Sequence, residues 1–503
     1  RWKANRKQTI GVCRIMKKSA DGKNIVIIGS GIGGLSTGII LSILNYDVTI
    51  VEKNPLPGGL MRSYRRSGIN CPVGVHYTGA LGNNEPLGRI FRLLGINVHD
   101  LFERMGQDGV IDRYIFDDFT FDLPPGIDAY EEELKKAFPD EKAAIAVVAA
   151  NLRKFARLLL DPSFLLNQGD LFRNIEYFDS MGEYVQKLNL SDHLRSVLAV
   201  PAYLIGVPLV ECPLIFHHMV LAGYLFSCWR LKENGGKMAD VFVRRFTELG
   251  GKLISNDGAK KIFLKSGKAA GLQLESGCSL PADAVVAAIH PKTLLPLLPP
   301  EALKKSYRQR ILGMKETEGV IVVQVSVDAG THQEMPYNIY RLHPGEKGIL
   351  KNGIFCQLRR SNAPEISLLT IITKSLYNDW SKWKNTKPGR RGLEYEEKKL
   401  RIAHDLLQAA DKILGKLTTP RIIDVFTPLT LRDYVNCADG SCYGLMHSSS
   451  QLLKIASLNN VPLPGLYLAG QNVVAPGVLG TTLGSFNAAS KIAGAEHLAK
   501  ILQ

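Results

Sequence analysis

Four glycines and one acid near the start of the chain have the types and the spacing that hold a dinucleotide. The run GSGIGG supplies Gly29, Gly31, Gly33 and Gly34 in a G-x-G-x-x-G pattern, and Glu52 follows. Gly29 permits a tight turn, backbone without a Cβ at Gly31 can approach a pyrophosphate, and Gly34 lets a helix pack closely. The Glu52 carboxylate is placed to accept hydrogen bonds from both ribose hydroxyls of an adenosine. The spacing predicts a binding site for an adenine dinucleotide.

These residues can act together only if a strand, a turn, a helix and a second strand carry them in that order. Residues 24–28, NIVII, are an apolar, β-branched run that is typical of a buried parallel strand. Apolar positions at helical spacing continue from Leu35 to Leu44, and a second strand is predicted at 47–51. The order is complete, so the N-terminus of the helix is expected to face the diphosphate.

The segment directly after the ribose acid distinguishes between the common dinucleotides. It contains Lys53, the pair Gly58 and Gly59, then Leu60 and Arg62, in the pattern E-K-x-x-x-x-G-G-x-x-x-S. This pattern resembles the corresponding segment of flavoproteins in the amine oxidase and phytoene desaturase superfamily. The resemblance implies that the cofactor is FAD, with the paired glycines against the flavin and diphosphate and the arginine close by.

A second glycine-rich element lies at the far end of the chain. Residues 466–469 are predicted to form a strand, and a loop that contains Gly470 and Gln471 follows it. The helix after this loop contains Gly480 and Thr481, and its small residues allow a close approach to a cofactor. The element resembles the C-terminal flavin-binding motif of the same superfamily, which implies that these four residues contact the cofactor.

A middle segment completes the cofactor domain by the same resemblance. A helix is predicted to open at residues 235–237 and to close at 250–251. Strands are predicted after it, near residue 253 and at 259–264, 270–274 and 282–290. The resemblance implies that the backbone near Ala259 faces the adenine.

The predicted fold class is α/β, with a Rossmann-like FAD-binding domain of the GR2 type interleaved with an α+β substrate-binding domain. The cofactor domain is expected to consist of residues 23–100, 230–310 and 415–503. The substrate domain is expected in the two insertions, residues 101–229 and 311–414. Residues 1–22 are expected to be a disordered tail or an added remnant outside the fold.

Three further motifs narrow the resemblance to the retinol saturase branch of the superfamily. These are VGVHYTG at residues 73–79, TPLT at 427–430 with DGSCYGLMH at 439–447, and GQN at 470–472. Phytoene desaturases and carotenoid isomerases share the framework without the His-Tyr pair. The resemblance implies an FAD-dependent oxidoreductase that saturates or desaturates a carbon–carbon double bond of an apolar polyene or isoprenoid lipid.

Such a reaction needs a proton donor or acceptor near the flavin. The resemblance makes His76 and Tyr77 the first candidates, with Tyr443 and His447 behind them. A histidine bonded to backbone beside the cofactor is the alternative, and the sequence leaves it open.

The substrate itself would be a lipophilic small molecule, and its pocket is expected to be apolar and aromatic. The apolar run at residues 196–229 can supply this lining and is expected to form short helices. Its candidate aromatic residues are Tyr203, Phe216, Tyr224, Phe226 and Trp229, and the predicted helix breakers are Pro201, Pro208 and Pro213.

Other functions remain open on the same framework. Reduced flavin could support the cis–trans isomerisation of a carotenoid without a net redox change, and the superfamily also contains amine oxidases. A non-enzymatic prenyl-binding protein of this fold would have lost its cofactor contacts, whereas the glycines and Glu52 are present here. No second G-x-G-x-x-G pattern follows a strand, so no nicotinamide domain is expected and the electron donor or acceptor stays unidentified.

The composition and charge of the chain indicate which other partners to expect. The 503 residues carry 62 Lys and Arg against 47 Asp and Glu, a formal charge of +15. No zinc spacing or RNA-binding signature accompanies this charge, so neither a metal site nor a nucleic-acid partner is expected. Trp380, Trp383 and the basic residues around them suit a peripheral membrane contact, although a solvated loop fits them as well. The eight scattered cysteines and the lack of a long apolar run favour reduced thiols in a cytoplasmic protein without a transmembrane helix.

Overall fold

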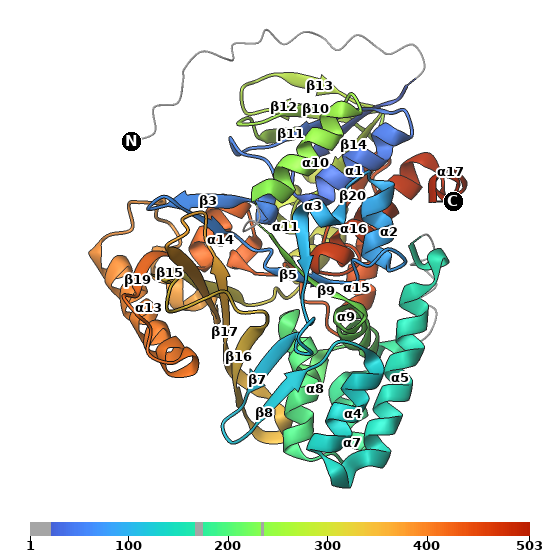
Figure 1. Cartoon of the computed structure of the whole chain (residues 1–503). Coiled ribbons are helices and arrows are strands. Elements are labelled where there is room, and N and C mark those ends of the chain that lie inside the picture. The colour runs from blue at the N-terminus through green and yellow to red at the C-terminus, as the bar shows by residue number, and fades with distance from the viewer. Residues whose placement is uncertain (1–21, 166–174, 233–235, 503) are drawn as a thin grey trace.

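The computed structural model describes residues 22–165, 175–232 and 236–502. The tail expected at 1–22 lies outside the described residues except for its last position, and so does Gly235 at the predicted start of the middle helix. Figure 1 shows a small sheet with its helices at the top, a large sheet at the lower left and a layer of helices at the lower right.

A five-stranded parallel sheet forms the centre of the upper part. Its order is β10-β2-β1-β14-β20, and every neighbouring pair is parallel. The strands are β1 (Asn24–Ile28), β2 (Asp47–Val51), β10 (Lys252–Ile254), β14 (Ala284–Ala287) and β20 (Leu466–Leu468). The last four residues of both β1 and β2 are buried, as expected for a parallel sheet covered on both faces. The predicted Rossmann-like sheet is confirmed, and its strands come from widely separated parts of the chain.

Three helices join this sheet to the glycine-rich segments. They are α1 (Ile32–Ile43), α10 (Gly236–Glu248) and α16 (Gly477–Ala493). A Cβ on Gly38 of α1 would lie 2.9 Å both from Ile50 of β2 and from Phe246 of α10, so α1 packs directly on its neighbours. The Ser485 hydroxyl of α16 donates to the Gly33 carbonyl of α1 over 2.8 Å. The N-terminal and C-terminal glycine-rich helices are therefore held side by side.

The rest of the upper part extends this layer. A three-stranded antiparallel sheet is formed by β11 (Ala259–Lys265), β12 (Lys268–Leu274) and β13 (Ser279–Pro281). Short helices follow, namely α11 (Pro291–Leu294), α12 (Lys305–Leu312), α15 (Leu452–Ala456) and α17 (Ala495–Leu502).

A seven-stranded sheet in the order β19-β15-β18-β17-β16-β7-β8 forms the second part. All neighbouring pairs are antiparallel except the parallel pair β16 and β7. The strands are β7 (Asp112–Ile115), β8 (Thr120–Leu123), β15 (Gly319–Asp328), β16 (Asn338–Pro344), β17 (Leu350–Arg360), β18 (Ile366–Ser375) and β19 (Arg421–Phe426). The sequence places β19 in the third cofactor segment, but it pairs with β15 and forms the edge of this sheet.

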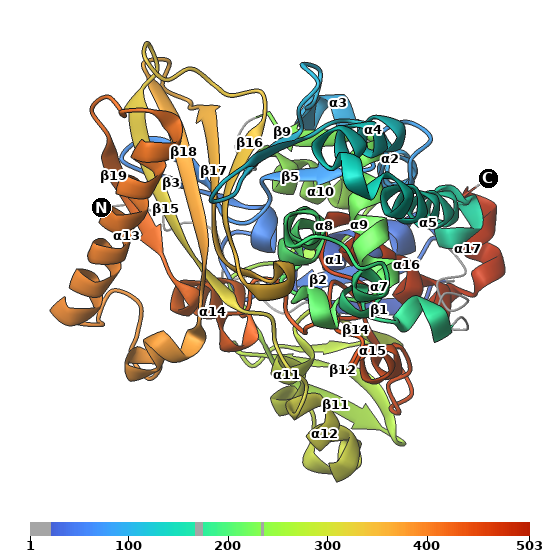
Figure 2. The same cartoon turned by 90° about the horizontal axis from the view of Figure 1, so that it is seen from below.

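The outer side of the large sheet is covered by α13 (Leu393–Leu414), as Figure 2 shows. Trp380 and Trp383 lie in the core between this helix and the sheet, with exposed fractions of 0% and 7%. The Lys398 ammonium lies 4.8 Å and 5.6 Å from their ring centroids. The two tryptophans expected at a membrane interface are thus core residues with a cation–π contact, whereas the basic residues Lys382, Lys384, Lys387 and Arg390 are exposed.

Helices make up the third part, with two small sheets that connect it to the others. The helices of this layer are α4 (Ile127–Ala137), α5 (Lys142–Leu160), α7 (Met181–Lys187), α8 (Asp192–Leu204) and α9 (Leu214–Phe226), whereas the short helices α2 (Pro86–Leu93) and α3 (Val98–Leu101) lie in the upper part (Figure 1). The small sheets contain β3 (Ser63–Arg66) with β4 (Ile69–Pro72), and β5 (Tyr77–Gly79), β9 (Cys228–Leu231) and β6 (Phe102–Arg104). Within the described ranges, no helix is long and apolar enough to span a bilayer.

The apolar run at 196–229 forms α8 and α9, as short helices were expected there. The prediction that Pro201 breaks the first helix is wrong, because Pro201 lies inside α8. Pro208 and Pro213 do act as boundaries, since each directly precedes a helical turn. Together the three parts of the molecule enclose the site.

Candidate active site

The glycines of the first motif lie in the turn between β1 and α1 and at the start of α1, and they differ in what surrounds them. Gly29 has a φ of 97°, and a Cβ on Gly34 would lie 1.9 Å from the Gly29 carbonyl oxygen, so the turn closes only without a side chain. A Cβ on Gly33 would lie 2.9 Å from the Cα of Gly470, which brings the C-terminal loop against α1. A Cβ on Gly31 would meet no atom within 4 Å. Of the four, Gly31 is the one that leaves open space for a ligand.

Glu52 lies at the end of β2 with only 7% of its surface exposed, and it lines the same cavity as Gly31. One carboxylate oxygen accepts from the backbone N–H and the hydroxyl of Ser30, over 3.1 Å and 2.7 Å. The other accepts from the backbone N–H and the side-chain amide of Asn54, over 2.8 Å and 2.9 Å. These four bonds fix the carboxylate beside the glycine turn. Burial lowers the pKa of the neighbouring Lys53, which also lines the cavity.

The paired glycines fold a loop over the turn. Gly58 and Gly59 have φ values of 111° and 54°, which a residue with a side chain rarely adopts. A Cβ on Gly59 would lie 3.0 Å from the Cα of Gly31, so the loop touches the turn, and Leu60 projects into the cavity. Arg62 does not line the cavity. Its guanidinium donates to the carbonyls of Gly59, Leu56 and Tyr434 over 3.0, 3.1 and 3.1 Å and so fastens the loop to the end of α14 (Pro428–Val435).

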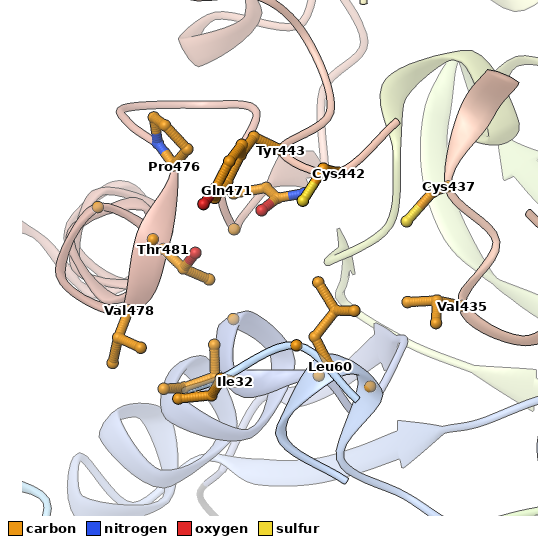
Figure 3. A pocket seen from close by; sticks show the side chains of 18 of the residues that line it. Ile32, Leu60, Val435, Cys437, Cys442, Tyr443, Gln471, Pro476, Val478 and Thr481 are labelled. Atoms are coloured by element: carbon orange, nitrogen blue, oxygen red, sulfur yellow. The ribbon is translucent and has the colours of Figure 1, made fainter. Parts of the chain in front are cut away.

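The C-terminal motif closes the cavity from the opposite side. Gly470, Gln471, Gly480 and Thr481 all line it, together with Ala259 at the start of β11. Figure 3 shows Gln471 and Thr481 on one side of the open space, with Ile32 and Leu60 from the N-terminal segment across from them. Cys437 and Cys442 line it as free thiols, as expected, and burial raises the pKa of each to about 12. The expectation of reduced thiols is wrong for Cys278, which is disulfide-bonded. The predicted cofactor residues thus meet around one space, except Gly34, Gly58 and Arg62, which shape its walls from behind.

That space is one cavity of about 730 Å³, within the usual size range of ligand sites. It runs from the glycine turn and Glu52 to a chamber of aromatic side chains. The expected aromatic residues Tyr203, Phe216 and Tyr224 line this chamber. Phe226 and Trp229 do not, because they lie at the end of α9 and in β9, where Trp229 donates to Ser227 over 2.7 Å.

The structure brings three of the four candidate catalytic residues, His76, Tyr77 and Tyr443, to this cavity. His76 carries a buried Nδ1 without a hydrogen-bond partner, and burial lowers its pKa to about 4. His76 is therefore neutral near pH 7. His447 lies outside the cavity lining with 1% of its surface exposed, and its Nδ1 is 2.9 Å from the Leu445 carbonyl. His447 therefore fits the alternative stated for the candidate histidines, in which the ring is bonded to backbone and takes no part in the reaction.

Two further aromatic residues line the cavity, although no motif in the sequence predicts them. Tyr340 of β16 and Phe355 of β17 form the aromatic wall with Tyr77, whose ring stacks on Phe355 at 6.2 Å. The hydroxyl oxygens of Tyr77 and Tyr340 are 2.6 Å apart. No local motif marks Tyr340 and Phe355, because only the sheet brings them to residues in the N-terminal part of the chain.

The family model for the flavin containing amine oxidoreductases matches residues 32–489. The chain belongs to this family. The cradle fits its cofactor, FAD, because Gly31 leaves room for a diphosphate and Glu52 offers a fixed carboxylate to a ribose. The flavoprotein is an FAD-dependent oxidoreductase of the predicted α/β fold.

Relatives of known name cover nearly the whole flavoprotein. The all-trans-retinol 13,14-reductase of Danio rerio is 25% identical over 93% of this chain and 85% of its own length. Prolycopene isomerase 1 of an Oncidium hybrid cultivar is 25% identical over 96% of this chain and 86% of its own length. A crystal structure of an oxidoreductase from Methanosarcina mazei has a TM-score of 0.64 at 16% identity, over 92% of this chain and 98% of that chain. The predicted resemblance to this superfamily is confirmed.

Proposed function

We propose that this flavoprotein adds hydrogen to a carbon–carbon double bond of an apolar polyene or isoprenoid lipid. One observation carries the proposal: the cavity is continuous from the diphosphate cradle at Gly31 to the aromatic chamber at Tyr224 and Phe355. A polyene has few polar groups, so aromatic and apolar walls are what it needs. The relatives named for a retinol reductase and a prolycopene isomerase support the same substrate class.

The cofactor supplies a hydride when it is reduced, and the chain supplies the surroundings and the proton. Leu60 and Val322 help to keep the cavity apolar. His76 is neutral near pH 7, so its ring is a poor acid there. Tyr77 and Tyr340 hold hydroxyl protons at the cavity wall and are the better placed donors to a carbon of the substrate.

All-trans-retinol is the first probe, and the test is a single turnover. FAD-loaded protein is reduced by dithionite without oxygen and mixed with the probe, and the product is analysed by chromatography and mass spectrometry. We expect a product heavier by two hydrogens and a return of the oxidised flavin absorbance. Prolycopene is the second probe and is tested in the same way. If neither all-trans-retinol nor prolycopene is converted to a product, the proposal is overturned.

Isomerisation is the second candidate, favoured by the similarity to prolycopene isomerase 1 over 96% of this chain. Isomerisation would change a double bond from cis to trans without adding hydrogen. The same experiment separates the two functions, because an isomer keeps the mass of the probe and leaves the flavin reduced.

A further inference from the structure

A carboxyl group lies directly behind the aromatic wall of the cavity. Asp112 of β7 has an exposed fraction of 0% and does not itself line the cavity. The Tyr77 hydroxyl, which does line it, donates to one carboxyl oxygen of Asp112 over 3.1 Å. The side-chain amide of Asn338 donates to the other oxygen over 2.8 Å. Asp112 is therefore one hydrogen bond away from the substrate space.

The surrounding amides decide where a proton can sit on this carboxyl. Gln357 donates its side-chain N–H to the Asn338 carbonyl oxygen over 2.8 Å, which turns the Asn338 N–H groups toward Asp112. One oxygen of Asp112 must therefore accept from Asn338. An added proton goes to the other oxygen, the one that faces Tyr77.

No basic side chain balances this carboxyl within the described part of the chain. The groups that face it are Asn338 and Tyr340 of β16, Tyr77 of β5 and Tyr224 of α9, together with Tyr114 of its own strand and Cys228 of β9. Burial raises the pKa of Asp112 to about 7, in spite of the hydrogen bonds from Asn338 and Tyr77. The carboxyl holds a proton below about pH 7 and loses it above.

The direction of the hydrogen-bond chain depends on that proton. With Asp112 ionised, Tyr77 must donate to the carboxylate, and Tyr340 can donate only to Tyr77 along the 2.6 Å contact. With Asp112 protonated, the carboxyl can donate to Tyr77 and Tyr77 to Tyr340. The Tyr340 hydroxyl is then free to donate into the cavity. The neutral carboxyl thus sets an outward-pointing chain that ends at the substrate.

We propose that Asp112 stores the proton used in the reaction and releases it to the substrate through Tyr77 and Tyr340. The inference rests on the proposed function and adds its proton source. As a C–H bond forms on one carbon of the double bond, the Tyr340 O–H bond breaks, Tyr340 takes the proton of Tyr77, and Tyr77 takes that of Asp112. The carboxyl ends as a carboxylate, and the neighbouring carbon receives the hydride that the reduced cofactor supplies.

The test is Asp112→Asn in the FAD-loaded protein, with all-trans-retinol as the probe. An asparagine keeps both the size and the hydrogen bonds, because it can accept from Asn338 and donate to Tyr77, but it has no proton to release. General acid catalysis is worth about 10²- to 10⁴-fold, so a loss of that size in the single-turnover rate is expected. The wild-type rate should fall above about pH 7, whereas the rate of the variant should not change with pH there.

A matched control lies on the same hairpin. Asp122 of β8 is paired with Arg113 at 2.7 Å and is part-exposed, away from the cavity lining. Asp122→Asn should keep both the rate and its fall above pH 7. An Asp112→Asn protein with the wild-type rate and pH profile would overturn the inference.

An infrared titration tests Asp112 without any turnover. In oxidised, FAD-loaded wild-type protein, the carbonyl stretch of a protonated carboxyl should disappear as the pH is raised through about 7, and Asp112→Asn should lack this band. A wild-type protein without the band overturns the inference, whatever the enzyme does with retinol. A wild-type protein with the band that leaves both polyene probes unchanged sinks the proposed function instead and leaves the buried acid in place.

Discussion

The two ends of the cavity are built in different ways. At the cofactor end, the ligand space is bounded by backbone: Gly31 opens it, Gly59 lies on the turn, and Gly470 comes from the far end of the chain. At the substrate end, the space is bounded by side chains such as Tyr77, Tyr340 and Phe355 on separate strands. A site bounded by backbone can therefore be recognised from short local motifs, whereas a site bounded by side chains depends on which strands pair in the folded protein.

The same contrast extends to charge. Four hydrogen-bond donors hold the Glu52 carboxylate in place beside the glycine turn. The Asp112 carboxyl has two donors and no cation among the described residues, and burial raises its pKa to about 7. In the proposed reaction, Glu52 would bind the cofactor and Asp112 would exchange a proton.

The largest effect should come from closing the tight turn of the cofactor end. Gly34→Ala places a methyl group 1.9 Å from the Gly29 carbonyl oxygen, so α1 must shift away from β1. Such overpacking costs about 3 kcal/mol or more of the free energy of unfolding. Urea unfolding of the protein without added FAD measures it, and a Gly34→Ala protein as stable as the wild type would contradict the account.

Gly31→Ala is the matched change that should spare the fold and break only the cofactor end. Its methyl group would meet no atom within 4 Å, and the φ of −64° at Gly31 suits alanine. We expect the free energy of unfolding to change by less than about 1 kcal/mol. FAD affinity should fall by about 100-fold or more, equivalent to about 2.7 kcal/mol, because the methyl group fills the approach to the diphosphate. Fluorescence titration with FAD checks this, and unchanged affinity would remove Gly31 from the site.

Two buried histidines of α9, the helix that carries Phe216 and Tyr224, should make the free energy of unfolding depend on pH. His217 and His218 of α9 are fully buried, and burial lowers their pKa values to about 4 and 3. The unfolded chain binds these protons near pH 6.5 and the folded chain does not, so stability falls as the pH drops from about 6.5 toward 4. His217→Gln should reduce this slope by about 1.4 kcal/mol per pH unit. Unfolding curves at several pH values measure the slope. An unchanged slope in the variant would show that His217 is exposed to solvent in the folded protein.

The smallest effect should come from trimming the aromatic wall alone. Phe355→Leu removes a ring that stacks on Tyr77 and lines the cavity, at a cost of about 1 kcal/mol in substrate affinity. Retinol affinity should fall several-fold while FAD affinity stays unchanged. A change in FAD affinity of the same size would show that the two ends are not separate.

The sequence predicts the cofactor end well because its determinants are neighbours in the chain. The strand, glycine turn, helix and acid between residues 24 and 52 all appear where they are expected. Arg62 shows the limit, since its guanidinium is occupied by the Tyr434 carbonyl, 372 residues away. His447 shows it again, because the motif gives the residue but not the burial that takes it from the cavity.

For the substrate end, the sequence predicts the apolar and aromatic nature of the pocket but not all of the residues that form it. An apolar, aromatic pocket is present, but the role of Asp112 depends on Asn338, which is 226 residues away in sequence and adjacent through the parallel pairing of β7 and β16. No periodicity in either strand marks that pairing. Pro201 inside α8 is a similar case, because the buried packing of the helix outweighs the local preference of proline for a boundary.

A crystal structure of the FAD-loaded protein with all-trans-retinol tests most directly whether one cavity serves both ligands. We expect FAD against Gly31, Glu52 and Thr481, and the polyene against Tyr224, Tyr340 and Phe355 in the same continuous space. Retinol bound elsewhere on the molecule, or FAD in the aromatic chamber with the glycine cradle empty, would contradict it.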